Sequence, residues 1–296
     1  MTQQTHDQYD ADQQEGDLSR RDFVAMGLAA GVVAAGIPTS AAMPVVETMV
    51  EIKTPDGTCD AAFSHPTTGT HPGVIIWPDA FGLRPAIREM GKRLAGEGYA
   101  VLTVNPYYRV GKGQLLDTKT FSFQNDRAKL APLMGSITAD GAAEKDAAAF
   151  VAWLDTQKQV NASKKIGTQG YCMGGPLVMR TSAAVPNRIG AGGSFHGGGL
   201  VTQNANSPHL LVPKIKAKMY FGVASNDDMQ QPTAKDTLKA AFDAAKNPAK
   251  IEVYSSLHGW CMSDMPVAAG APPIYNQADA EKAWGELLAL YKAALA

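Results

Sequence analysis

Cysteine is scarce in this sequence, which also lacks an excess of charge of either sign and any long hydrophobic run. The three cysteines, Cys59, Cys172 and Cys261, form no Cys-x-x-Cys pair and no Cys/His spacing that suits zinc, so neither a metal centre nor another cofactor is expected. A thiol redox protein needs a resolving cysteine beside the reactive one, and that pattern is missing. Lysine and arginine number 27 against 28 acidic residues, which gives no general attraction to nucleic acid or anionic lipid. A small molecule is the expected partner.

The first 42 residues differ in character from the rest of the chain. Residues 1–18 are polar and rich in Gln and Asp, which predicts disorder. Ser-Arg-Arg-Asp-Phe-Val at residues 19–24 resembles a twin-arginine export signal, and the apolar run at 24–37 that follows is too short and weak for a stable membrane span. Small residues at 40–42 predict cleavage after Ala42. We therefore expect recognition by the twin-arginine export machinery and a mature protein in the periplasm or outside the cell; the alternative is a chance arginine pair in a disordered tail.

Residues 43–296 are long enough for one α/β domain with a substantial core. From Gly73 onward, short apolar runs alternate with longer amphipathic segments, a pattern typical of a mostly parallel sheet with helices on both faces. No internal repeat or interdomain linker is visible. Strands are predicted at 73–77, 99–104, 166–170, 189–194, 217–223 and 251–255, and helices at 85–97, 142–154, 233–245 and 278–295.

A candidate nucleophile lies in Gly-Tyr-Cys-Met-Gly-Gly at residues 170–175, between a predicted strand and a presumed helix. Glycines permit the tight turn that lifts a nucleophile clear of a sheet, so this is a nucleophile elbow with Cys172 in place of serine. A thiol is mostly protonated at neutral pH; it needs a base, while the N-terminus of the following helix favours the thiolate. Cys59 and Cys261 are expected to be structural thiols, although export would permit a disulfide between them.

The acid and the base are expected downstream of Cys172, because hydrolases with such an elbow order their triad as nucleophile, acid, histidine. His258 follows the last predicted strand, at the sheet edge where ligands bind. Asp227 lies in the turn after the strand before it and can orient the imidazole, with Asp228 as its immediate rival. His196 also follows a strand but precedes every candidate acid, so we expect it in the pocket wall or at the surface.

The Gly-x-Cys-x-Gly-Gly elbow resembles that of the dienelactone hydrolase family. The resemblance runs from about residue 61 to 291 and includes Asp-Ala-Phe-Gly at 79–82, His-Gly-Trp at 258–260, Tyr275 and Trp284. It implies an α/β-hydrolase fold and hydrolysis of an ester or lactone, as by a carboxymethylenebutenolidase. It also favours Asp227 over Asp228, because the family segment runs through a short turn to Asp with a proline soon after, here Pro232.

Two loops carry further candidates. The backbone N–H groups of Ala80 and Met173 are expected to form the oxyanion hole. Asp79 stands where the family has a glutamate that takes the thiol proton when substrate arrives; the alternative for Asp79 is a turn or helix cap. The resemblance also implies an arginine that contacts an anionic substrate, and Arg109 stands in the matching loop. Its alternative is an ordinary surface arginine.

These residues predict acyl transfer to water, in which Cys172 attacks a carbonyl and His258, oriented by Asp227, moves the protons. The substrate is expected to be a dienelactone or another lactone, a plain ester or a thioester. A general carboxylesterase or thioesterase on the same fold is one alternative. The other is a binding protein that keeps the fold without chemistry, with Cys172 buried away from His258.

Overall fold

The computed structural model describes residues 42–268 and 270–295. Except for Ala42, the predicted export signal lies outside the described residues, so export stays a prediction. In the described ranges, no helix is both long and apolar enough to cross a bilayer.

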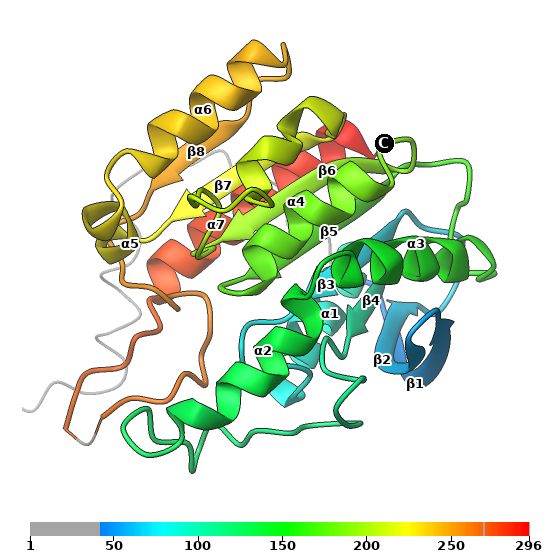
Figure 1. Cartoon of the computed structure of the whole chain (residues 1–296). Coiled ribbons are helices and arrows are strands. Elements are labelled where there is room, and N and C mark those ends of the chain that lie inside the picture. The colour runs from blue at the N-terminus through cyan, green and yellow to red at the C-terminus, as the bar shows by residue number, and fades with distance from the viewer. Residues whose placement is uncertain (1–41, 269, 296) are drawn as a thin grey trace, which may run out of the picture. The chain divides into compact units, whose positions relative to one another are not determined.

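An eight-stranded sheet forms the centre of the domain, in the order β1-β2-β4-β3-β5-β6-β7-β8 (Figure 1). Neighbouring strands from β4 to β8 are parallel, whereas β2 is antiparallel to both β1 and β4. This confirms the predicted α/β fold with a mostly parallel sheet. The strands are β1 (Val45–Thr54), β2 (Gly57–Pro66), β3 (Gly73–Trp77), β4 (Ala100–Val104), β5 (Ile166–Tyr171), β6 (Ile189–Phe195), β7 (Lys218–Val223) and β8 (Lys250–Val253).

The three central strands are buried because both of their faces are covered. Every residue of β3, β4 and β5 is buried. Strands of that kind have nearly continuous apolar sequences instead of an alternating pattern, and Gly-Val-Ile-Ile-Trp in β3 is an example. All six predicted strands are present, with ends that differ from the prediction by at most two residues.

The β1–β2 hairpin was not predicted. Its register joins Thr54 to Gly57 across Pro55 and Asp56. Gly57 adopts φ +142°, a conformation that residues with a side chain rarely take. The Pro-Asp-Gly turn signal was therefore present in the sequence, but β1 is largely exposed, and the buried β2 includes the polar residues Asp60, Ser64 and His65, so neither strand has a clear apolar pattern.

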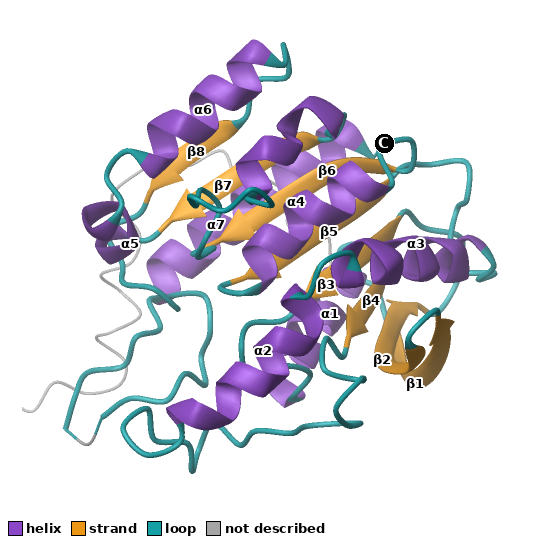
Figure 2. Cartoon of the chain, viewed as in Figure 1, coloured by secondary structure: helices purple, strands orange, loops and turns teal. Residues whose placement is uncertain are grey.

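Helices cover both faces of the sheet (Figure 2). On one face, α3 (Ala142–Asp155), α4 (Gly174–Ala184) and α6 (Ala234–Ala244) bury their apolar sides in the first core cluster. On the other face, α1 (Pro85–Gly96) and α7 (Gln277–Ala294) form the second. Shorter elements fill the connections: η1 (Arg127–Lys129), α2 (Leu130–Thr138), η2 (Pro208–Lys214) and α5 (Ser225–Gln230).

The possible disulfide between Cys59 and Cys261 is absent. All three cysteines are free thiols. Cys59 belongs to the first core cluster and Cys261 packs against the second, so the sheet separates them. Burial raises the pKa of both thiols above the usual range, which keeps them protonated and unreactive.

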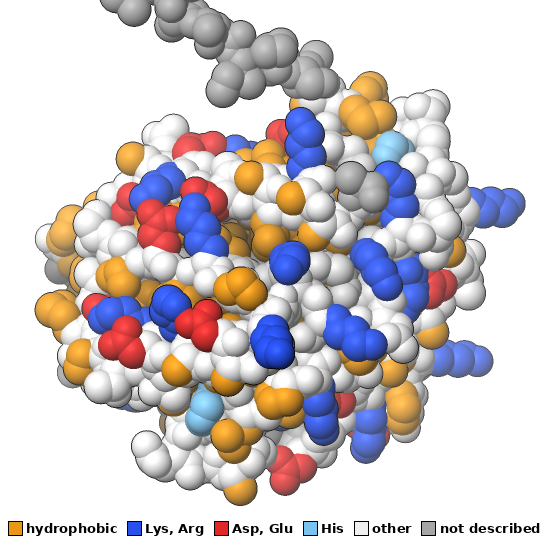
Figure 3. Space-filling model, turned by 90° about the horizontal axis from the view of Figure 1, so that it is seen from above, with side chains coloured by type: hydrophobic (Ala, Val, Ile, Leu, Met, Phe, Trp, Pro, Cys, Tyr) orange, Lys and Arg blue, Asp and Glu red, His pale blue; other side chains and the backbone are white. Residues whose placement is uncertain are grey.

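The surface carries charges of both signs. Figure 3 shows basic and acidic side chains interspersed with apolar ones on one face of the molecule. This matches the formal net charge of −1.

Candidate active site

The chemistry-bearing residues gather at the carboxyl edge of the parallel strands. Asp79 follows β3, Cys172 follows β5, His196 follows β6, Asp227 follows β7 and His258 follows β8. Loops at this edge of adjacent parallel strands lie side by side, which is why α/β folds place their ligands there.

Cys172 sits on a strained turn between β5 and α4. Its φ of +51° is rare for a residue with a side chain. Added Cβ atoms show why glycines surround it: at Gly170 one would lie 2.2 Å from the Gly174 carbonyl oxygen, and at Gly174 one would lie 2.3 Å from the Trp77 carbonyl oxygen. The helix N-terminus is thus pressed against the ends of β5 and β3, and Cys172 is raised above the sheet edge as the elbow pattern predicted.

His258 is held by Asp227. Its Nδ1 lies 2.7 Å from Asp227 Oδ2, and its backbone N–H donates to Asn226 Oδ1 at 2.8 Å. The rival carboxylate, Asp228, instead pairs with Lys235 at 2.6 Å. The structure therefore brings Asp227, not Asp228, to the imidazole.

The pKa of His258 is raised to about 10, although burial by itself would lower it. The hydrogen bond to Asp227, together with the hydrogen-bonding contact and charge of the neighbouring Cys172 side chain, outweighs that burial. The ring is protonated at neutral pH and faces both partners. The side chains of Cys172, His258 and Asp227 thus form a connected row.

Activity that depends on protonated His258 is expected to fall as the pH rises through about 10. The folded pKa lies above the ordinary value of about 6.5, so this proton's contribution to stability is complete below that value and is lost as the pH passes the folded pKa. Asp227→Asn removes the carboxylate that raises the pKa, so the alkaline limb of kcat/KM should move to lower pH. Profiles for wild type and variant measure this; an unmoved limb would show that Asp227 does not set it.

The two backbone amides expected to form an oxyanion hole belong to segments at this edge of the sheet. Met173 is the N-cap of α4, and Ala80 follows β3. Among the described residues, neither amide N–H has a hydrogen-bond acceptor. Tyr107, which the sequence did not single out, donates from its hydroxyl to the Ala80 carbonyl oxygen at 2.8 Å and to the Met173 sulfur at 3.3 Å. Tyr107 thereby fixes both residues relative to each other.

Asp79 is buried, but its partner is Arg84, which sequence analysis missed. The Arg84 guanidinium donates to both Asp79 oxygens, at 2.7 and 2.9 Å, and Asp79 Oδ1 also accepts the Phe81 N–H at 2.9 Å. These contacts favour the turn role over that of a proton acceptor for the thiol. A lone arginine before a helix carries no sequence signal for such a pairing.

Arg84 also joins the oxyanion loop to the loop that carries His258. Two of its N–H groups donate to the carboxylate of Asp264, both at 2.8 Å, and one donates to the Gly82 carbonyl oxygen. All five guanidinium N–H groups are then engaged, and the side chain is fully buried. No donor of Arg84 is left for a substrate.

The predicted substrate contact of Arg109 is not supported by the geometry. Its guanidinium binds the buried Asp146 through two nitrogens, at 2.8 and 2.7 Å, and Asp56 at 2.8 Å. It also stacks over Tyr108, 4.5 Å from the ring centroid. The correction has a physical reason: two carboxylates from distant segments neutralise Arg109, which its position in the sequence could not show.

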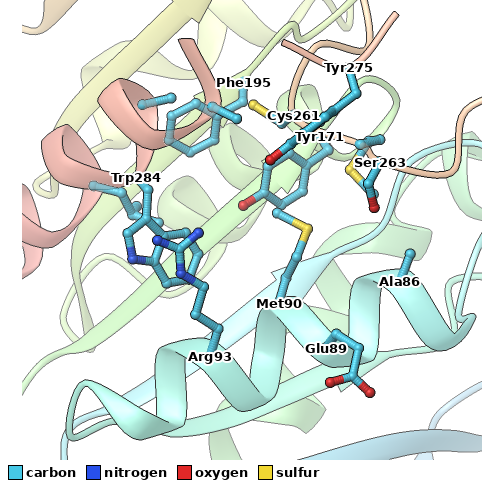
Figure 4. Close-up of a pocket in the computed structure, with 14 residues that line it drawn as sticks. Ala86, Glu89, Met90, Arg93, Tyr171, Phe195, Cys261, Ser263, Tyr275 and Trp284 are labelled. Carbon is cyan, nitrogen blue, oxygen red and sulfur yellow. The ribbon is translucent and has the colours of Figure 1, made fainter. Parts of the chain in front are cut away.

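Two cavities are lined by residues from the elements that carry the site. One of about 400 Å³ opens between α1 and α7, where Arg93 lies over the Trp284 indole (Figure 4). No member of the Cys172, Asp227 and His258 row lines it. A smaller one, of about 160 Å³, is bordered by Asp227 and by residues 197–201. In the described part of the chain, no cluster of three or more His, Cys, Asp or Glu side chains could hold a metal ion.

Comparison with known proteins identifies the family of the chain. The model of the dienelactone hydrolase family matches residues 59–295. A carboxymethylenebutenolidase from Pseudomonas sp. (strain P51) is 26% identical over 68% of this chain and 79% of its own length. Carboxymethylenebutenolidase 1 from Cupriavidus pinatubonensis is 27% identical over 71% of this chain and 84% of its own.

A solved structure shares the fold. It is that of a dienelactone hydrolase-like promiscuous phosphotriesterase from metagenomic libraries, with a TM-score of 0.69 and 21% identity, covering 87% of this chain and all of the other. The family model spans most of the described chain. The matched range includes every element from β3 to α7, and therefore every candidate site residue. The protein therefore belongs to the dienelactone hydrolase family and has its α/β-hydrolase fold.

Proposed function

We propose that this hydrolase cleaves carboxylic esters or lactones with Cys172 as nucleophile, His258 as acid and base, and Asp227 as the residue that orients His258. The observation that carries the proposal is the position of His258, whose Nδ1 lies 2.7 Å from Asp227 Oδ2 and whose pKa is raised by both Asp227 and the neighbouring Cys172 side chain. A helix N-terminus beside the sulfur adds stabilisation for a thiolate.

The reaction then runs in two halves. The Cys172 thiolate attacks the carbonyl carbon, the N–H groups of Ala80 and Met173 hold the oxyanion, and the C–O bond breaks as His258 gives its proton to the departing oxygen. Water attacks the resulting thioester while His258 takes a proton from it. The C–S bond breaks, the carboxylic acid leaves, and the thiolate and imidazolium are restored.

We propose further that neutral substrates are preferred over the anionic dienelactone, carboxymethylenebutenolide. Arg84 and Arg109 both donate to buried carboxylates, those of Asp79 and Asp146. The residue after Ala80 is Phe81, whose ring packs edge-on against Phe121 at 5.0 Å, and an aromatic wall favours an apolar group. A substrate carboxylate placed here would find both arginines already paired with carboxylates.

Purified wild type should hydrolyse p-nitrophenyl esters, and it should favour a dienelactone methyl ester over the free carboxylate by about tenfold in kcat/KM, a difference of about 1.4 kcal/mol. Release of nitrophenolate and loss of lactone absorbance measure the two reactions. A preference for the free carboxylate would refute the neutral-substrate proposal and leave the triad intact. No turnover of any ester, lactone or thioester would refute the hydrolase assignment and favour the binding alternative.

We also propose that the chain is exported by the twin-arginine pathway, on the strength of the arginine pair at residues 20–21 and the small-residue site ending at Ala42. N-terminal sequencing of the protein from a periplasmic fraction tests this. A first residue of Met43 supports export with cleavage after Ala42, whereas an uncleaved protein confined to the cytoplasm contradicts it.

A further inference from the structure

A second histidine lies beneath the catalytic row, and the sequence placed it in the pocket wall or at the surface. His196 directly follows β6 and is completely buried. Its backbone has φ +40°, and its own N–H donates to the Gly222 carbonyl oxygen at 2.8 Å. The backbone conformation is unusual for a residue with a side chain, so the surrounding structure fixes it.

The His196 ring contacts both Cys172 and His258. Its Nδ1 accepts the backbone N–H of Cys172 at 3.1 Å, an N–H that the Phe195 carbonyl oxygen also accepts at 3.1 Å. Its centroid lies 5.0 Å from that of His258, in an edge-to-face arrangement. His196 therefore packs against the nucleophile's backbone and the base's ring at once.

The Cys172 contact bears on the tautomer of His196. Because Nδ1 faces a donor, the contact favours a neutral ring that bears its proton on Nε2. Nε2 is buried and has no partner among the described residues. A buried donor without a hydrogen-bond partner costs about 1–3 kcal/mol of stability. A purely structural role for His196 does not account for this cost.

The ring is also kept neutral. Burial, and then the charge of His258, lower the pKa of His196 well below its usual range. Aromatic neighbours complete the enclosure, with Trp260 at 5.0 Å and Tyr171 at 6.0 Å between centroids. A charged ring here would repel protonated His258, whereas a neutral one leaves the Cys172 to His258 contact undisturbed.

We propose that His196 is a positioning residue: its Nδ1 accepts the backbone N–H of Cys172, and its ring packs edge-to-face against the ring of His258. This inference rests on the proposed function, because the contacts of His196 matter for catalysis only if Cys172 and His258 are catalytic. His196 is fully buried and does not contact substrate, so its effect should appear in the chemical step and not in substrate binding.

The decisive comparison is between His196→Asn and His196→Gly. Both residues tolerate the positive φ, but only asparagine presents an acceptor, Oδ1, close to where Nδ1 lies. A hydrogen bond is worth about 0.5–1.5 kcal/mol, so the glycine variant should lose up to about tenfold in kcat with KM within twofold of wild type. The asparagine variant should recover most of that loss.

Two readouts do not need an active enzyme. The rate at which iodoacetamide alkylates Cys172, located by peptide mass spectrometry, should fall in the glycine variant and recover in the asparagine variant. In wild type, ¹⁵N chemical shifts of the His196 ring should show a proton on Nε2 and a bare Nδ1 from about pH 5 to 9. The NMR measurement uses wild type alone, so it stands even if a variant fails to fold.

Several results would overturn the inference. Equal kcat and equal alkylation rates for wild type and the glycine variant would show that the contact positions nothing. Equal losses in both variants, a change in KM alone, or a proton on Nδ1 would do the same. If wild type hydrolyses no ester, the proposed function fails by itself, and the alkylation and NMR results still decide the role of His196.

Discussion

Cys172→Ala is expected to lower kcat/KM for p-nitrophenyl ester hydrolysis by at least about 10³-fold. Removing a nucleophile leaves only oxyanion stabilisation and substrate binding, which account for a small part of the acceleration in enzymes of this kind. The initial rate of nitrophenolate release, at equal concentrations of folded protein, measures the loss. Near-UV circular dichroism should match the wild type, because the partly exposed thiol is not a main part of the core.

Cys59→Ala is the matched control for that variant. Its thiol lies in the first core cluster, where it donates to the Asn105 carbonyl oxygen at 3.4 Å. Its loss should cost some stability but leave kcat/KM of the folded fraction within about twofold of wild type. If Cys172→Ala kept wild-type turnover, or if Cys59→Ala lost it to the same degree, another nucleophile would have to be sought.

Arg84→Met is expected to destabilise the protein by about 3–5 kcal/mol, because it leaves the buried carboxylate of Asp79 without a countercharge. Urea denaturation followed by tryptophan fluorescence measures the free energy of unfolding. Any folded fraction should also have a lower kcat, since the Ala80 peptide follows Asp79 directly and Arg84 ties this loop to Asp264. Combining Arg84→Met with Asp79→Asn should restore part of the stability.

An exposed ion pair provides the comparison. Lys239 and Asp243 lie one helical turn apart in α6, with exposed side-chain fractions of 64% and 48%. Lys239→Met should change stability by less than about 0.5 kcal/mol. A similar small change for Arg84→Met would mean that Asp79 and Asp264 do not depend on the guanidinium, contrary to the role given to Arg84 here.

Local signals in the sequence predicted most of the framework. Buried strands such as β3 and β4 are indicated by apolar runs, and α7 is indicated by a long amphipathic segment. The ends of these elements were therefore predicted to within two residues. The β1–β2 hairpin was not predicted because β1 is largely exposed and the buried β2 carries polar residues. The stretch after β4 also hid α2, a nine-residue helix that contains a proline.

The elbow residues were predictable because strain demands glycine at fixed spacings around Cys172. Pairings across the fold were not. Arg84 and Asp264 are 180 residues apart in the chain, and nothing near either position indicates the other. The pairing of Arg109 with Asp146 and the packing of His196 against His258 could not be predicted either, because in each case the two residues are distant in the sequence.

The central claim is that Cys172 carries the acyl group during turnover, and acid quenching within the first turnovers of a p-nitrophenyl ester tests it most directly. Intact mass followed by peptide mapping should find one acyl group, attached to the peptide that contains Cys172, with Cys59 and Cys261 unmodified. Continued ester hydrolysis with an acyl group on any other residue, or with Cys172 never acylated in wild type while turnover persists in Cys172→Ala, would contradict the account.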